Sequence, residues 1–152
     1  MATFSSDLLW EITKYQGSST LVKRPQSGGI QFSRDPLNLK NQYSRKYEGL
    51  VDDKAIGVQA GSEGGVVLLT KKAGKGHQPA SHIQQASLSS SRGTRKTYST
   101  IVKATANRNY RTDLRKDAVA RASAIRKSQK PVKESKPAKV RGAKARAAAA
   151  SA

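Results

Sequence analysis

Few residues of this chain have the types and spacing that catalysis or metal binding requires. The two histidines, His77 and His82, stand five positions apart and would lie on different faces of a helix, and the chain has no cysteine to complete a metal site. The acidic doublet Asp52-Asp53 falls in an expected turn, where carboxylates more often cap or solvate the backbone than catalyse. We therefore expect two solvated histidines, no metal, no cofactor and no enzymatic activity.

Two glycine-rich segments superficially resemble nucleotide-binding loops. A phosphate loop needs the pattern G-x-x-x-x-G-K-[ST], because the hydroxyl after the lysine binds the metal. Around Gly74-Lys75-Gly76, Leu69 stands where the first glycine belongs and Gly76 replaces the hydroxyl residue. The segment 61–65 does not match the dinucleotide-binding pattern and is typical of a hairpin turn.

The chemistry of the chain lies instead in its basic residues. The 152 residues include 29 Lys and Arg against 10 Asp and Glu, a formal net charge of +19. Residues 1–70 hold 8 basic and 7 acidic side chains, whereas residues 71–152 hold 21 and 3. Each cation that neutralises a phosphate releases a condensed counterion, so this excess predicts a nucleic-acid partner. A membrane surface or an acidic protein is the alternative that composition alone leaves open.

The candidate RNA-binding residues are cations near the expected loops of the first half and throughout the second half. They are Lys23, Arg24, Arg34, Lys40, Arg45, Lys46, Lys71, Lys72, Lys75, Arg92, Arg95, Lys96, Lys103, Arg108, Arg111, Arg115, Lys116, Arg121, Arg126, Lys127 and Lys130. Tyr110 joins them because its ring, between two arginines, could stack on an unpaired base. Packing of Tyr110 back onto a helix at 112–128 is an equal alternative.

The elements that position these residues follow from periodicity and turn signals. Residues 7–16 predict an amphipathic helix with Leu8, Ile12 and Tyr15 on one face. Short β-prone runs, separated by glycine and proline turns, predict a small antiparallel sheet that includes a hairpin at 55–70, with the helix covering one face. The four runs are residues 20–23, 30–33, 55–58 and 66–70.

The second half predicts helices without a core of their own. A helix is expected over 94–107, and a clearer one over 112–128 with Thr112 as a possible N-cap. The stripe Leu114, Ala118, Ala122 and Ile125 is narrow and should bury little unless it lies on a partner. The predicted fold class is thus α+β, with a head at 1–70, a flexible basic connection at 71–93, a basic helical extension at 94–130 that would bind nucleic acid, and a disordered Lys/Ala-rich tail at 131–152.

Four segments resemble, in order and spacing, the family of the eukaryote-specific large-subunit ribosomal protein L-twenty-eight. They are residues 20–24, 32–50, 54–58 and 110–131, and the resemblance covers about residues 8–70 and 94–131. The run DPLNLKN at 35–41 and the runs RASAI and SQKP within 121–131 are long enough to be specific.

This resemblance implies a structural component of the cytosolic large ribosomal subunit that binds rRNA and has no enzymatic activity. We expect its contacts to be mainly with phosphates, which position a protein without reading sequence. The expected partners are large-subunit rRNA and neighbouring ribosomal proteins, with no membrane and no small-molecule substrate. The expected location is the cytoplasmic ribosome, after nucleolar passage during assembly. The alternative function is a ribosome-assembly or chromatin-associated factor that binds nucleic acid and then leaves.

Overall fold

Short helices and two small antiparallel sheets form the part of the chain that the computed structural model describes, which is residues 4–14, 20–132, 134 and 141–150. This confirms the α+β class. In chain order the elements are α1 (Ser6–Thr13), β1 (Leu21–Arg24), the 3-10 turn η1 (Pro25–Ser27), β2 (Ile30–Ser33), β3 (Ile56–Ala60), β4 (Val66–Lys71), β5 (Ile83–Leu88), α2 (Thr94–Thr105), the 3-10 turn η2 (Thr112–Leu114), α3 (Arg115–Ser128) and α4 (Ala143–Ala150).

The larger sheet has the antiparallel order β3-β4-β5, so β4 lies in the centre. The predicted hairpin is confirmed, with Val58 opposite Leu68 and a turn through Gly65. Gly65 has a φ of 81°, and a Cβ there would lie 2.2 Å from the carbonyl oxygen of Leu88. The strand β5 was not predicted, because its residues 84–87 are polar or small and exposed. It forms because the free edge of β4 offers backbone hydrogen bonds that need no particular side chains.

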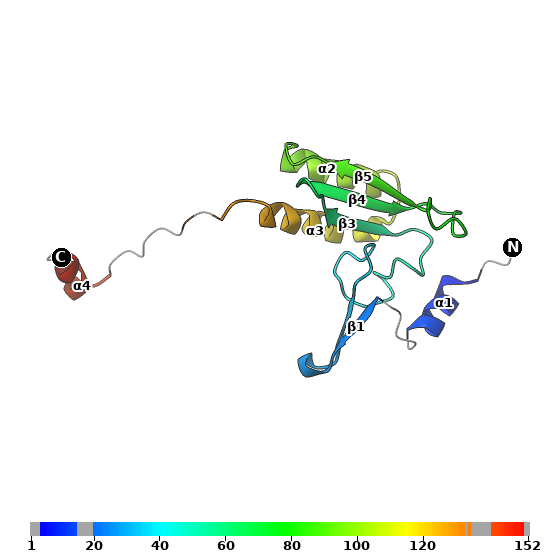
Figure 1. Ribbon diagram of the computed structural model, residues 1–152, viewed down its shortest axis with the longest axis horizontal. Helices are drawn as coiled ribbons and strands as arrows, with labels where there is room; N and C mark the ends of the chain where they lie inside the picture. Colours follow the sequence, from blue (N-terminus) through cyan, green and yellow to red (C-terminus); the bar gives the residue numbers. More distant parts are fainter. Residues whose placement is uncertain (1–3, 15–19, 133, 135–140, 151–152) are drawn as a thin grey trace.

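The helices α2 and α3 pack on one face of this sheet (Figure 1). The core contains Ile56, Val58 and Leu68 from the sheet, all at most 3% exposed, and completely buried Ile101 and Ala118 from the helices. The narrow stripe of α3 therefore has its partner within the chain, and its alanines allow the helix to approach the strands closely. The core does not follow the predicted division at residue 70, because the sheet and both helices share it.

A loop covers the other face of the sheet. Leu37, Ala55 and Leu69 form a second, smaller buried cluster there. A Cβ on Gly57 would lie only 2.3 Å from the carbonyl oxygen of Pro36, so the loop crosses the strand where there is no side chain. The carboxylate of Asp35 holds the loop, because its two oxygens accept hydrogen bonds from the N–H groups of Leu37 and Gly49 at 2.9 and 3.0 Å.

The strands β1 and β2 form a separate two-stranded ribbon, so the expectation of one sheet with four strands was wrong. Phe32 on this ribbon is 39% exposed and does not belong to the core, because a ribbon of four-residue strands is too small to bury both faces. In Figure 1 the ribbon extends away from the larger sheet.

The predicted N-terminal helix is present but does not cover the larger sheet. None of the residues of α1 is buried, and Leu8 and Ile12 are about half exposed. The helix α1 instead contacts the loop after β2, where the ring of Trp10 packs on that of Tyr43 with centroids 5.1 Å apart. The end of the predicted helix, including Tyr15, lies outside the described residues.

The predicted disordered tail at 131–152 lies partly outside the described residues, which here comprise 131, 132, 134 and 141–150. Residues 143–150, which the structure does describe, form α4, six of whose eight residues are alanine, the strongest helix former. Figure 1 shows this helix apart from the body of the protein. A helix this short is marginal in water without packing, so α4 adds little to the stability of the fold.

Candidate nucleic-acid interface

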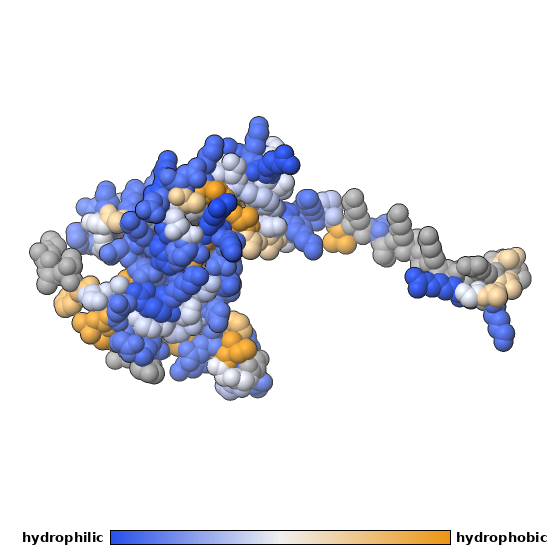
Figure 2. Space-filling model, turned by 180° about the vertical axis from the view of Figure 1, so that it is seen from behind, coloured by the Kyte–Doolittle hydropathy of each residue, from blue (hydrophilic) through white to orange (hydrophobic). Residues whose placement is uncertain are grey.

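Most of the candidate cations are exposed, and they lie on the β1–β2 ribbon, on loops and on α2 and α3. The exposed ones are Lys23, Arg24, Arg34, Lys40, Lys46, Lys72, Lys75, Arg92, Arg95, Lys96, Lys103, Arg108, Arg115, Lys116, Lys127 and Lys130. Figure 2 shows hydrophilic residues over most of the body when it is seen from behind. These side chains are accessible to phosphate, and their contacts with RNA stay a prediction.

Two arginines of α3 are instead used inside the protein. The guanidinium of Arg121 donates from Nε to the carbonyl of Val58 at 3.0 Å and from Nη1 to that of Leu39 at 3.1 Å. Arg126 donates to the carbonyls of Ser90 and Arg92 at 3.0 and 2.9 Å. These bonds tie α3 to a strand and to two loops, so both arginines position the helix.

Lys71 is a third candidate that the fold itself uses. Its Nζ donates to the backbone carbonyls of Gly49, Leu50 and Asp52 at 3.1, 3.0 and 2.7 Å. Burial of the ammonium lowers the pKa of Lys71, and nearby carboxylates only partly offset this effect. The lysine therefore closes the loop 49–52 against β4.

Asp52 joins two further candidate arginines. One oxygen of its carboxylate lies 2.6 Å from Arg45 Nη1, and the other accepts a hydrogen bond from Arg111 Nη1. Arg45 also binds Asp7 of α1, and Arg111 also binds Asp113 and two backbone carbonyls. The sequence indicated only an acidic turn here. The pairing of Asp52 with Arg111 was not visible because the two residues are 59 positions apart along the chain.

Tyr110 is partly buried against the core, which matches the intramolecular alternative rather than base stacking. Its hydroxyl donates to the carbonyl of Lys71 and lies 3.2 Å from both the N–H and the carbonyl oxygen of Ala55. Burial raises the pKa of Tyr110 despite these hydrogen bonds. The buried cluster that Tyr110 packs against includes Leu114, Ala118 and Ala122 from the predicted 112–128 helix as well as residues of the sheet.

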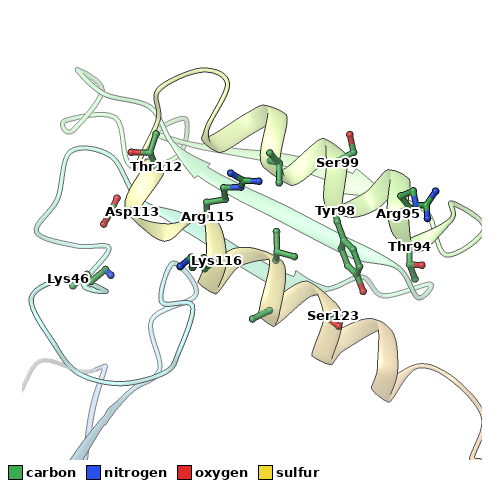
Figure 3. Close-up of a pocket in the computed structure, with 13 residues that line it drawn as sticks. Lys46, Thr94, Arg95, Tyr98, Ser99, Thr112, Asp113, Arg115, Lys116 and Ser123 are labelled. Carbon is green, nitrogen blue, oxygen red and sulfur yellow. The ribbon is translucent and has the colours of Figure 1, made fainter.

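Four of the exposed cations line a groove between α2 and α3 (Figure 3). This α2–α3 groove has a volume of about 1490 Å³ and is lined by Lys46, Thr94, Arg95, Tyr98, Ser99, Val102, Thr112, Asp113, Arg115, Lys116, Val119, Ala120 and Ser123. Its lining thus combines four cations, one carboxylate, hydroxyl groups and apolar side chains. In Figure 3 the side chains of Arg115 and Tyr98 extend from opposite helices into the space between them.

The histidines take no part in this groove. His77 is exposed, and Nδ1 of His82 lies 2.6 Å from the carbonyl oxygen of Pro79 in the loop before β5. Within the described residues, no set of three or more His, Cys, Asp or Glu is placed to hold a metal ion. Among the same residues, no helix has the length and apolar character needed to span a bilayer.

Comparisons with known proteins point to one family. The profile of the Ribosomal L28e protein family matches residues 8–128. The large ribosomal subunit protein eL28 of Schizosaccharomyces pombe is 43% identical over 129 residues, which is 85% of this chain and 96% of that protein. Proteins of the same name from Trypanosoma cruzi and Caenorhabditis elegans are 35% and 32% identical over 85 residues each, about 55% of this chain and 54% and 64% of those proteins.

Proposed function

The chain belongs to the Ribosomal L28e protein family, and on this premise we propose that it is a structural, non-enzymatic constituent of the large ribosomal subunit that binds rRNA mainly through phosphates. Neighbouring ribosomal proteins are the other expected partners. The protein is located in cytoplasmic ribosomes and passes through the nucleolus during assembly.

The observation that carries the rRNA proposal is that several acidic side chains are paired within the protein while most candidate cations are exposed. Asp52, Asp113 and Asp117 in the folded body already form ion pairs with arginine or lysine of the same chain. Sixteen candidate cations remain exposed, so the surface keeps a large positive excess. A compact fold with such an excess repels itself, and a polyanion relieves that repulsion.

Phosphate contact explains this surface better than base reading does. The exposed cations are dispersed over the ribbon, loops and helices, and so they suit a backbone that passes over several elements. The three relatives named above are all large-subunit proteins, which favours permanent incorporation over the alternative of an assembly or chromatin factor.

The test is the salt dependence of binding to a purified large-subunit rRNA fragment. One variant replaces four exposed lysines of α2 and α3 by glutamine, and a matched variant replaces the same four by arginine. The four are Lys96, Lys103, Lys116 and Lys127. If all four touch phosphate, the glutamine variant should flatten the slope of log K against log salt by about 3, at ~0.7–0.9 for each phosphate.

The arginine variant should restore the slope because it restores the charge. An unchanged slope in the glutamine variant would show that this helical face does not lie on phosphate.

A further inference from the structure

We propose that the α2–α3 groove binds an unpaired segment of RNA, with phosphates on its basic side chains and at least one base against its apolar lining. This inference rests on the rRNA-binding function proposed above, and it states which form of RNA one site on the protein takes.

The charge of the α2–α3 groove suits a phosphate chain. Arg95 comes from the start of α2, Arg115 and Lys116 come from the start of α3, and Lys46 comes from a loop. Since the helices are joined by a short connection and run in opposite directions, their first turns lie at opposite ends of the groove (Figure 3). A strand lying along the groove would therefore meet cations at both ends.

The one carboxylate in the lining does not cancel this charge. Asp113 accepts two hydrogen bonds from Arg111, both at 3.1 Å. Burial alone would raise the pKa of Asp113, but these bonds outweigh it and lower the pKa. The carboxylate is thus ionised and paired with an arginine that does not itself line the groove.

The length of the groove sets the size of the segment that fits. On α3 the lining runs from Arg115 to Ser123. Eight steps of a helix cover about 12 Å at about 1.5 Å for each residue. This length admits a few nucleotides of an extended strand.

The apolar lining distinguishes an unpaired strand from a duplex. Between the cations lie Val102, Val119 and the partly buried ring of Tyr98. A duplex presents phosphates and sugars outward and hides the faces of its bases. An unpaired base exposes its faces and stacks on aromatic or apolar side chains, so only the unpaired form uses this part of the groove.

The experiment compares full-length protein with variants that fill the groove or leave it open, without any change of charge. Ser123→Trp places a large side chain at an exposed position of the lining, and Ala124→Trp places the same side chain at the next exposed position, which does not line the groove. The probes are an oligouridylate of about 12 nucleotides, within the usual range of site sizes for single strands, a duplex of equal length, and an oligomer of equal length with abasic central positions. Circular dichroism establishes that each variant is folded.

The expected result is tighter binding of the oligouridylate than of the abasic strand, and a loss of about tenfold in that binding for Ser123→Trp, in line with the contribution of one stacked base. Ala124→Trp should bind as the unmodified protein does. Equal binding of oligouridylate and abasic strand, or equal loss in both variants, would overturn the inference. Salt-dependent binding of the duplex that persists in such a case would leave the proposed rRNA function intact and place its phosphate contacts outside the α2–α3 groove. Loss of binding to every RNA in the unmodified protein would instead contradict the proposed function itself.

Discussion

The carboxylate of Asp52 is the point at which α1, the loop around residue 45 and the turn before α3 are held together. It pairs with Arg45 at 2.6 Å and with Arg111 on its other oxygen. Arg45 in turn donates to Ser6 and Asp7 of α1. Replacing Asp52 by asparagine preserves the shape of the side chain and removes its charge. The substitution therefore tests the ion pairs with little change in packing.

The expected cost follows from how much of each side chain solvent reaches. The side chains of Asp52 and Arg111 are 16% and 17% exposed, and that of Arg45 is 32% exposed. Exposed ion pairs contribute about 0–1 kcal/mol, whereas breaking a fully buried pair costs about 3–5 kcal/mol. Two pairs with intermediate exposure place the loss for Asp52→Asn at about 2 kcal/mol. This is below the buried limit because water screens Arg45 in part.

Urea denaturation followed by circular dichroism measures this loss. With an m value of about 2 kcal/mol/M for a small protein, a loss of about 2 kcal/mol lowers the midpoint by about 1 M. Asp53→Asn is the matched control, because Asp53 is the exposed neighbour in the same turn and should change stability by no more than about 0.5 kcal/mol. Equal midpoints for the two variants would refute the reasoning that the pairs of Asp52 stabilise the fold.

Two further substitutions test the packing around the loop 35–57. Burial, helped by the charge of Asp35, raises the pKa of Glu48 above its usual 4.5. Above about pH 4.5 the folded state therefore holds a proton that the unfolded state releases, so stability should fall as pH rises until the raised pKa is passed. Glu48→Gln should remove that fall in urea titrations at several pH values. Identical pH profiles for the protein and this variant would contradict the account. Gly57→Ala should lower the free energy of unfolding by about 1–3 kcal/mol in the same assay, because its Cβ would collide with the backbone of Pro36. Gly76→Ala should be nearly neutral, because the space around Gly76 is open. Equal effects of the two substitutions would show that the loop around Pro36 moves aside easily.

The sequence predicted well those elements whose buried positions are occupied by large apolar side chains in a regular pattern. Apolar runs and a glycine turn were enough to place β4 and its hairpin with β3, and a helical stripe was enough to place α3. The strand β5 was not predicted from the sequence, because Gln84 and Gln85 are exposed. Its place in the sheet depends on pairing with the edge of β4 rather than on alternation of apolar residues. The packing of α3 on the sheet was not predicted either, because Ala118 and Ala122 have little apolar area although both are completely buried.

The positive charge of the candidate interface could be predicted from the sequence, but which cations are exposed on it could not. Arg115 and Arg121 look alike in the sequence of α3, yet one is exposed and the other binds two backbone carbonyls. Those carbonyls belong to residues about 60 and 80 positions away, so no local pattern marks them. The α2–α3 groove was not predicted for the same reason: its lining residues come from three segments that are separate along the chain.

The distinction between the two groups of cations has a physical basis. Four of the five inward cations are arginines, whose planar guanidinium offers five donors and so suits several fixed acceptors at once, as Arg111 and Arg121 show. Lysines such as Lys116 and Lys127 point outward, where a hydrated ammonium keeps its freedom until a phosphate replaces water. Repulsion among the outward cations opposes folding, while Arg45 and Arg111 are paired with carboxylates of the same chain. Added salt therefore acts with opposite signs on this protein. It relieves the repulsion and favours the free fold, but it reduces the counterion release that favours RNA binding.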